Sequence, residues 1–246
     1  AYIPPTIAGV VLAYRKKYLL GGVITALFIA LQIQSNHIQM SYYFMFVILF
    51  FIIAYFVDAY EKKELPHFFK ASAILALAAV VGVCVNISNL YHTYEYSKET
   101  MRGKSELKQE GPAANQTSSG LDRDYITNWS YGIGETLTLL VPNVKGGGCS
   151  TTLSQNETAM AKANPMYGNL YSQLTPYFGD QPWTAGPVYV GAFVVFLFIL
   201  GCFIVKGPLK WALLGATIFS ILLSWGKNFM GLTDFFIDYI PMYNKF

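Results

Sequence analysis

Long apolar runs separated by short polar connectors dominate this sequence, and they restrict the folds open to it. A helix needs about 20 mostly apolar residues to cross the hydrocarbon layer of a bilayer, with a range of about 17–25. Six runs qualify wholly or in part: 68–90 and 187–205 unaided, 18–34 and 41–57 narrowly, 211–225 with its flanks, and 3–14 as half of a helix. A transmembrane barrel would instead show short segments of alternating polarity. The sequence therefore predicts an all-α polytopic membrane protein, built as a helical bundle.

The composition agrees with a membrane location. Apolar residues make up 54% of the chain and charged residues 13%, whereas soluble domains average about 45–50% and about 25%. The net charge of +3 is too small to indicate a nucleic-acid partner. Three scattered cysteines, Cys84, Cys149 and Cys202, predict neither a disulfide framework nor a metal cluster.

Basic residues gather in three short connectors, 15–17, 61–70 and 206–210. If every apolar run crosses the bilayer once, these connectors share one side, which the positive-inside rule makes cytoplasmic. The remaining connections then lie outside: 35–40, 91–186 and 226–246. The sequence thus predicts a large, partly helical extracytoplasmic loop.

These spans divide the chain into three parts. We expect about four transmembrane helices in 1–90, the first of them partial, a loop region at 91–186, and two helices with an outer-surface segment in 187–246. Within the loop, 97–120 has the polar composition of a mobile excursion or a solvated helix. Residues 1–5 show no Met and no signal-peptide signature, and we expect the chain to be an internal segment of a longer protein.

Four polar residues mark the predicted outer turn between two spans: Asn36, His37, Gln39 and Tyr43. Their side chains could bind sugar hydroxyls or a phosphate, and the imidazole could move a proton. Helix capping, with the tyrosine anchored at the membrane interface, explains the same residues. Both interpretations stay open.

Glycines and charged residues combine in the run 131–148. Glu135 follows two glycines, at a position suited to a helix N-terminus. Asn143 and Lys145 precede glycines whose backbone N–H groups could approach a phosphate, with the ammonium as counter-charge. The order of residues is not that of a nucleotide-binding P-loop. A flexible loop is the alternative, and the residues alone favour it.

Polar and aromatic side chains also flank the last two spans. Asp180 could bind a hydroxyl, a metal or a basic partner group, and Trp183 could stack on a sugar ring. Lys227 and Asn228 follow a span at its predicted outer end, where an amine suits a lipid phosphate. An interfacial tryptophan and a lysine that snorkels to the surface are the alternatives.

Other chemistries lack their signatures in this sequence. No His/Cys set has zinc-ligand spacing, and no Gly-x-Ser-x-Gly elbow occurs. The spanning runs are nearly free of charge, whereas ion-coupled carriers place ionisable groups at the midplane. This pattern counts against a transporter.

Four motifs, in order along the chain, resemble the YfhO-type bacterial membrane proteins in the version found in Bacteroidetes-like bacteria: 36–43, 129–143, 177–182 and 223–228. The likeness extends through nearly the whole chain. It implies a longer chain of many helices, a GT-C-like glycosyltransferase fold and a place in the bacterial cytoplasmic membrane. The implied activity is the transfer of sugars from polyprenyl-phosphate carriers outside the cytoplasm.

The resemblance also implies roles for individual residues. Enzymes of the GT-C type hold an acidic residue in their first outer loop as base or metal partner. We expect this segment to start after that loop, which would place the true base outside it. Asp124, Glu135 and Asp180 are the substitutes to test as catalytic carboxylates, and a divalent metal ion is the one cofactor left open. Lys145 or Lys227 would stabilise the leaving phosphate.

Two other classes of function remain as alternatives. A non-catalytic membrane subunit of an envelope or secretion assembly would use the aromatic outer loop to dock membrane-protein partners, without need of the carboxylates. A lipid or oligosaccharide transporter would need a polar path through the helices. All three readings share the lipid bilayer as a partner.

Overall fold

The computed structural model describes residues 2–100 and 121–245, and regular structure within these ranges is helical throughout. This confirms the predicted all-α class. The polar excursion expected at 97–120 lies, from residue 101 onward, outside the described residues. In chain order the elements are α1 (Ile3–Tyr14), α2 (Tyr18–Gln34), α3 (Ile38–Glu61), α4 (Leu65–Cys84), α5 (Ile87–Lys98), α6 (Arg123–Thr127), η2 (Ile133–Leu139), η3 (Leu153–Gln155), α7 (Glu157–Met160), η4 (Pro165–Tyr167), α8 (Gly168–Tyr171), α9 (Ala192–Ile204), α10 (Pro208–Ser224), η5 (Gly226–Phe229), α11 (Met230–Tyr239) and η6 (Tyr243–Lys245).

Contacts divide the chain into two compact units. Unit 1 consists of 1–107 and 205–218, and unit 2 of 108–204 and 219–246. Each unit has its own packing, described in turn below.

The first four helices of unit 1 are joined by three connectors of the same design. Each connector has three residues, and the middle one adopts a left-handed backbone: Lys16 at φ 67°, Asn36 at φ 58° and Lys63 at φ 58°. One left-handed residue ends a helix and reverses the chain within a few residues. The connectors therefore bring consecutive helices back alongside one another.

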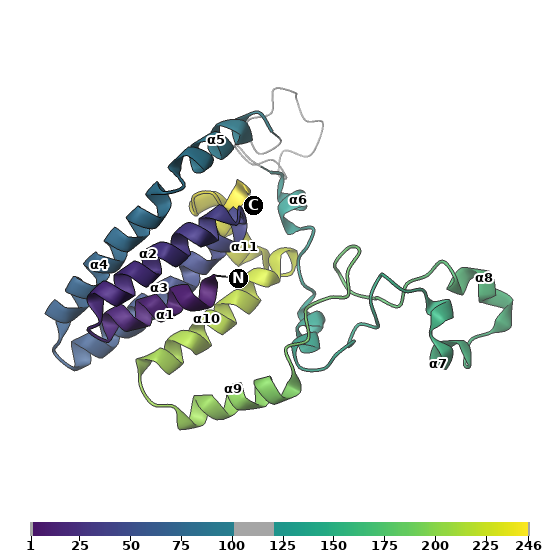
Figure 1. Ribbon diagram of the computed structural model, residues 1–246. Coiled ribbons are helices and arrows are strands. Elements are labelled where there is room, and N and C mark those ends of the chain that lie inside the picture. The colour runs from purple at the N-terminus through teal and green to yellow at the C-terminus, as the bar shows by residue number, and fades with distance from the viewer. Residues whose placement is uncertain (1, 101–120, 246) are drawn as a thin grey trace. The chain divides into compact units, whose positions relative to one another are not determined.

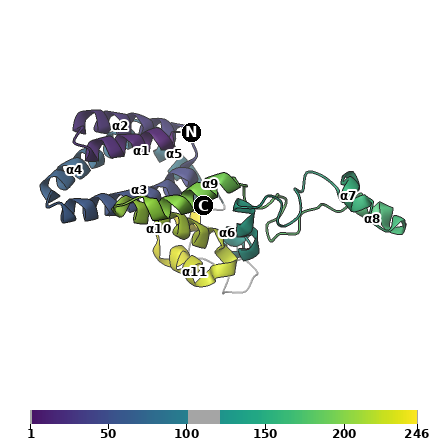
Figure 2. The same cartoon turned by 90° about the horizontal axis from the view of Figure 1, so that it is seen from below.

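Close packing of small residues joins α1 and α2. A Cβ atom at Gly21 would lie 2.5 Å from the backbone nitrogen of Ala13, and one at Gly9 would lie 2.5 Å from Thr25 Oγ1. Figures 1 and 2 show these helices side by side, and α2 also packs against α4. Backbones approach this closely at small residues, as is common between membrane helices.

Two or three elements have the length and composition to cross a membrane. They are α3, α4 and, as a single broken span, α10 with the segment Gly226–Tyr239, whose axes differ by 110°. The expected run 187–205 yields only the 13 residues of α9, which begins directly after Gly191 at φ 109°. At 1.5 Å per residue, α9 is about 20 Å long, shorter than the hydrocarbon layer of about 30 Å. Crossing by α1, α2 and α9 stays a prediction.

In unit 2, short helices and turns carry most of the chain. Arg123 at the start of α6 binds two carboxylates of α11: it contacts Asp234, and its Nη2 lies 2.6 Å from Asp238 Oδ1. Asp234 and Asp238, four residues apart, therefore act together as an anchor for α6.

In both ribbon views α7 and α8 lie at the end of a long excursion of unit 2.

Candidate functional site

A buried carboxylate lies at the centre of the polar residues of unit 2. The side chain of Glu135, in the first turn of η2, is only 1% exposed. Its Oε2 accepts a hydrogen bond of 2.7 Å from the backbone N–H of Gly132, and its own N–H donates to the Gly132 carbonyl at 2.9 Å. A buried polar side chain is tolerated when such donors surround it.

The remaining donors to Glu135 come from the turn 177–181. The Tyr177 hydroxyl donates to Glu135 Oε1, and the backbone N–H of Asp180 donates to the same oxygen at 3.2 Å. Burial, followed by the hydrogen bond to Glu135, raises the pKa of the Tyr177 hydroxyl above its ordinary value. Tyr177 therefore remains a protonated donor at neutral pH, and the backbone of Asp180 is held in one position.

A third segment, 224–228 at the end of α10, bonds to the residues just before Gly132. The backbone N–H of Lys227 donates to Ser130 Oγ at 2.9 Å, and Asn228 Nδ2 donates to the Tyr131 carbonyl at 2.9 Å. Gly226 has φ 41°, and a Cβ atom there would lie 1.9 Å from Ser130 Oγ. Only glycine fits both the backbone and the contact.

These contacts place an exposed acid beside an exposed base. Lys227 Nζ lies 3.4 Å from the Asp180 carbonyl oxygen, and Asn228 Nδ2 lies 3.4 Å from Asp180 Oδ2. Among the ion pairs of residues 2–100 and 121–245, none uses Asp180 or Lys227. We call Glu135, Tyr177, Asp180, Lys227 and Asn228 the carboxylate cluster.

Comparisons with protein-family models, curated proteins and solved structures found no match to this chain. The chemistry of the site therefore rests on its own residues.

The two carboxylates of the carboxylate cluster differ in a way that assigns them different tasks. Glu135 has both oxygens bonded within the protein, whereas Asp180 is exposed to solvent. An incoming hydroxyl can reach Asp180, while Glu135 positions the turn that carries it.

Other residues singled out in the sequence lie around this cluster in unit 2. Lys145 packs against Gly134, where a Cβ atom would lie 3.5 Å from Lys145 Nζ. The Lys145 carbonyl accepts from the N–H of Phe178 at 2.8 Å, which ties its loop to the Asp180 turn. Asn143 is exposed with φ 59°, and Trp183 is 88% exposed with φ 57°.

The remaining candidates belong to other parts of the fold. Asp124 is exposed on α6, one residue after the arginine that binds α11. Asn36, His37, Gln39 and Tyr43 belong to unit 1, where Asn36 forms the left-handed turn and His37 precedes α3. This geometry gives Asn36 and His37 a role in reversing the chain. A joint site of these four residues with the carboxylate cluster stays a prediction.

Sequence reasoning missed the partners that hold the cluster together. Tyr177 and Ser130 had no assigned role, yet each bonds to a segment at least 42 positions away in the chain. Gln181 likewise donates from Nε2 to the Trp129 carbonyl at 2.6 Å. All three residues lie inside the four motifs that carry the family resemblance. Membership of those motifs is the sequence signal that could have singled them out.

Within the described ranges, no three His, Cys, Asp or Glu side chains gather closely enough to hold an ion. The Asp180 carboxylate lies beside the Asn228 amide, and the Lys227 amine contacts the Asp180 backbone carbonyl.

Proposed function

We propose that this chain transfers a sugar from a polyprenyl-phosphate-linked donor to an envelope acceptor, at the outer surface of a bacterial cytoplasmic membrane and within a GT-C-like fold. The observation that carries the proposal is the contact of the exposed Lys227 amine with the backbone carbonyl of exposed Asp180, which brings these two residues together on adjoining turns. A general base and a cation side by side are what such a transfer requires.

The proposed step uses each group once. Asp180 accepts the proton of the acceptor hydroxyl as the oxygen attacks the anomeric carbon of the donor sugar. The bond from that carbon to the phosphate oxygen breaks, and the polyprenyl phosphate leaves with the electron pair. The ammonium of Lys227, with Lys145 beside Gly134, stabilises the charge that develops on the phosphate.

Sugar recognition falls to neighbouring side chains in this proposal. Asn228 and Asn143 offer amide donors and acceptors, and exposed Trp183 offers a flat apolar face for a pyranose ring. In unit 1, Asn36, His37, Gln39 and Tyr43 stay predicted sugar-binding residues in their own right. Glu135 acts as a positioning residue.

Loss of the Lys227 charge tests the role in stabilising the phosphate. Protein reconstituted in liposomes is supplied with polyprenyl phosphate carrying a radioactive hexose, and release of the sugar is measured. We expect Lys227→Gln to lower kcat/KM by about 10- to 100-fold, the effect of one hydrogen bond to a charged group. Lys227→Arg should retain part of the rate.

Lys162→Gln is the matched control, because Lys162 is exposed near α7 and belongs to no part of the proposed site. Equal rates for Lys227→Gln and the unchanged protein would contradict the role of Lys227. Absence of transfer from every hexose donor would contradict the proposal as a whole.

The orientation can be measured independently of activity. Native cysteines are replaced by Ala, and single cysteines are placed at exposed Gln173 or exposed Lys63. In intact cells, an impermeant maleimide should label Gln173→Cys and leave Lys63→Cys unlabelled until the membrane is opened. Labelling of both from outside would overturn the proposed topology.

A docking role is the second candidate, and surface exposure favours it. Met166, Phe178, Trp183 and Val188 are each at least 69% exposed in unit 2. Clusters of exposed apolar side chains are typical of interaction surfaces. Under this reading, Phe178→Ser would release membrane-protein partners in co-purification, while Asp180→Asn would not.

A further inference from the structure

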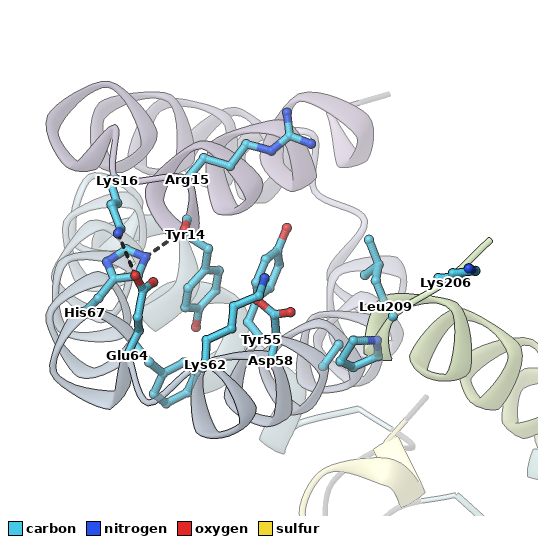
Figure 3. A pocket seen from close by; sticks show the side chains of 15 residues that line it. Tyr14, Arg15, Lys16, Tyr55, Asp58, Lys62, Glu64, His67, Lys206 and Leu209 are labelled. Atoms are coloured by element: carbon cyan, nitrogen blue, oxygen red, sulfur yellow. Dashed lines mark hydrogen bonds and ion pairs between the residues drawn. The ribbon is translucent and has the colours of Figure 1, made fainter.

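A cavity of about 510 Å³ lies in unit 1 where three connectors meet (Figure 3). Its walls come from the end of α1, the end of α3, the start of α4, and the start of α10 with the two residues before it. Small-molecule sites have volumes of about 300–1,000 Å³, so this cavity, here called the connector pocket, has room for a small polar ligand. It shares no residue with the carboxylate cluster.

Positive charge is in excess around the connector pocket. Four cations line it, Arg15, Lys16, Lys62 and Lys206, together with two carboxylates. Figure 3 shows Arg15, Lys62 and Lys206 coming from three different elements. One anion in the pocket would therefore meet cations from several sides.

Two of the cations are neutralised by the two carboxylates. Lys16 Nζ lies 3.0 Å from Glu64 Oε1, and Lys62 Nζ lies 2.8 Å from Asp58 Oδ2. The hydrogen bond from Lys16 lowers the pKa of Glu64, so this carboxyl group is ionised at neutral pH. Arg15 and Lys206 then supply a surplus of two positive charges.

Hydrogen bonds hold the aromatic wall of the pocket in place. The carbonyl of Tyr14 can only accept, so His67 Nε2 carries the proton donated to it at 2.8 Å. The other ring nitrogen, Nδ1, lies 2.7 Å from the Tyr18 hydroxyl. Tyr14 and Tyr55 stack with ring centroids 4.3 Å apart. A wall arranged in advance loses little entropy when a ligand binds.

We propose that the connector pocket binds a phosphate group, and that in the cell this phosphate is the headgroup of an anionic phospholipid. The guanidinium of Arg15 matches phosphate oxygens in geometry and charge. Exposed apolar side chains of α3, Phe56 and Val57, lie next to the pocket residues Tyr55 and Asp58 in sequence and suit an acyl chain. The positive-inside rule assigns these connectors to the cytoplasmic leaflet, where anionic lipids are concentrated.

The test compares two double variants with the same change in net charge. Arg15→Gln with Lys206→Gln removes the two surplus cations of the pocket, whereas Lys17→Gln with Lys210→Gln alters the same connectors outside it. Protein in neutral detergent is titrated with dioctanoyl phosphatidylglycerol, with dioctanoyl phosphatidylcholine and with inorganic phosphate, and the shift in Tm is recorded. Circular dichroism checks that each variant is folded.

We expect phosphatidylglycerol to raise Tm and the pocket variant to weaken its binding at least about tenfold, because two charge-assisted contacts are lost. The control variant should bind within about twofold of the unchanged protein. Binding of inorganic phosphate alone, with the same sensitivity to the pocket variant, would overturn the lipid assignment and identify a soluble phosphate compound as the ligand. Equal binding by all three proteins would overturn the site itself.

Discussion

Replacing Asp180 by Asn should lower sugar transfer by about 10²- to 10⁴-fold, the usual effect of losing general-base catalysis. The amide keeps the volume of the carboxylate, and its oxygen can still accept from Asn228 Nδ2, now 3.4 Å from Asp180 Oδ2. The backbone bonds from Asp180 to Glu135 and Lys227 do not involve the side chain. The variant therefore changes proton acceptance and leaves the fold in place.

Initial rates of hexose release from polyprenyl phosphate, in liposomes, measure this effect. Glu157→Gln serves as the matched control, since Glu157 is exposed at the start of α7. Asp124→Asn is measured in parallel, because Asp124 is the competing exposed carboxylate. An unchanged rate in Asp180→Asn would contradict the assignment of Asp180 as the base, and loss of rate in Asp124→Asn would transfer that role.

Replacing Gly179 by Ala should disrupt the turn that carries Asp180. The new methyl group would lie 1.5 Å from Glu135 Oε1 and 2.1 Å from the Tyr177 hydroxyl oxygen, so both side chains have to move. Moving Glu135 breaks the hydrogen bonds from Tyr177 and from the Asp180 N–H. Overpacking and loss of bonds to a buried charge together cost about 3 kcal/mol or more.

Native Cys149 offers a local probe of this disruption. It is half-buried, and its backbone N–H donates to the Thr184 carbonyl at 3.1 Å, within the segment that carries Gly179. With Cys84 and Cys202 replaced by Ala, thiol labelling of Cys149 should be about 100-fold faster in Gly179→Ala, as local opening becomes easier.

The matched control is Gly168→Ala at the start of α8, where no atom lies within 4 Å of the added methyl group. That variant should label at the rate of the unchanged protein. Equal labelling of both alanine variants would contradict a tightly packed Asp180 turn.

Much of the helical layout could be predicted because it depends on local pattern. The run 18–34 is α2 to the residue, and charged connectors separate α1 from α2 and α3 from α4 as expected. Within the run 187–205, α9 covers 13 residues and begins only after Gly191, whose positive φ is a backbone property that apolar composition does not report.

The sequence predicted the charged residues of the candidate site, but it did not predict which of them are buried or which residues they bond to. Glu135, Asp180 and Lys227 stand out from their neighbours as charged groups in glycine-rich and aromatic turns. Their division into a buried acid and an exposed acid depends on Tyr177 and on three segments far apart in the chain. Such pairing is a property of the tertiary fold, and no spacing rule encodes it.

Under the proposed function, the bend between α10 and α11 would determine how each substrate arrives. Lys227 follows α10 by three residues, at the point where the axis turns by 110°. The 17 residues of α10 measure about 26 Å, close to the thickness of the hydrocarbon layer. An amine directly beyond such a helix lies at the depth of lipid phosphates when the helix stands across the bilayer. The donor and the spent polyprenyl phosphate would then exchange by two-dimensional diffusion within one leaflet, and only the acceptor would need to approach through water.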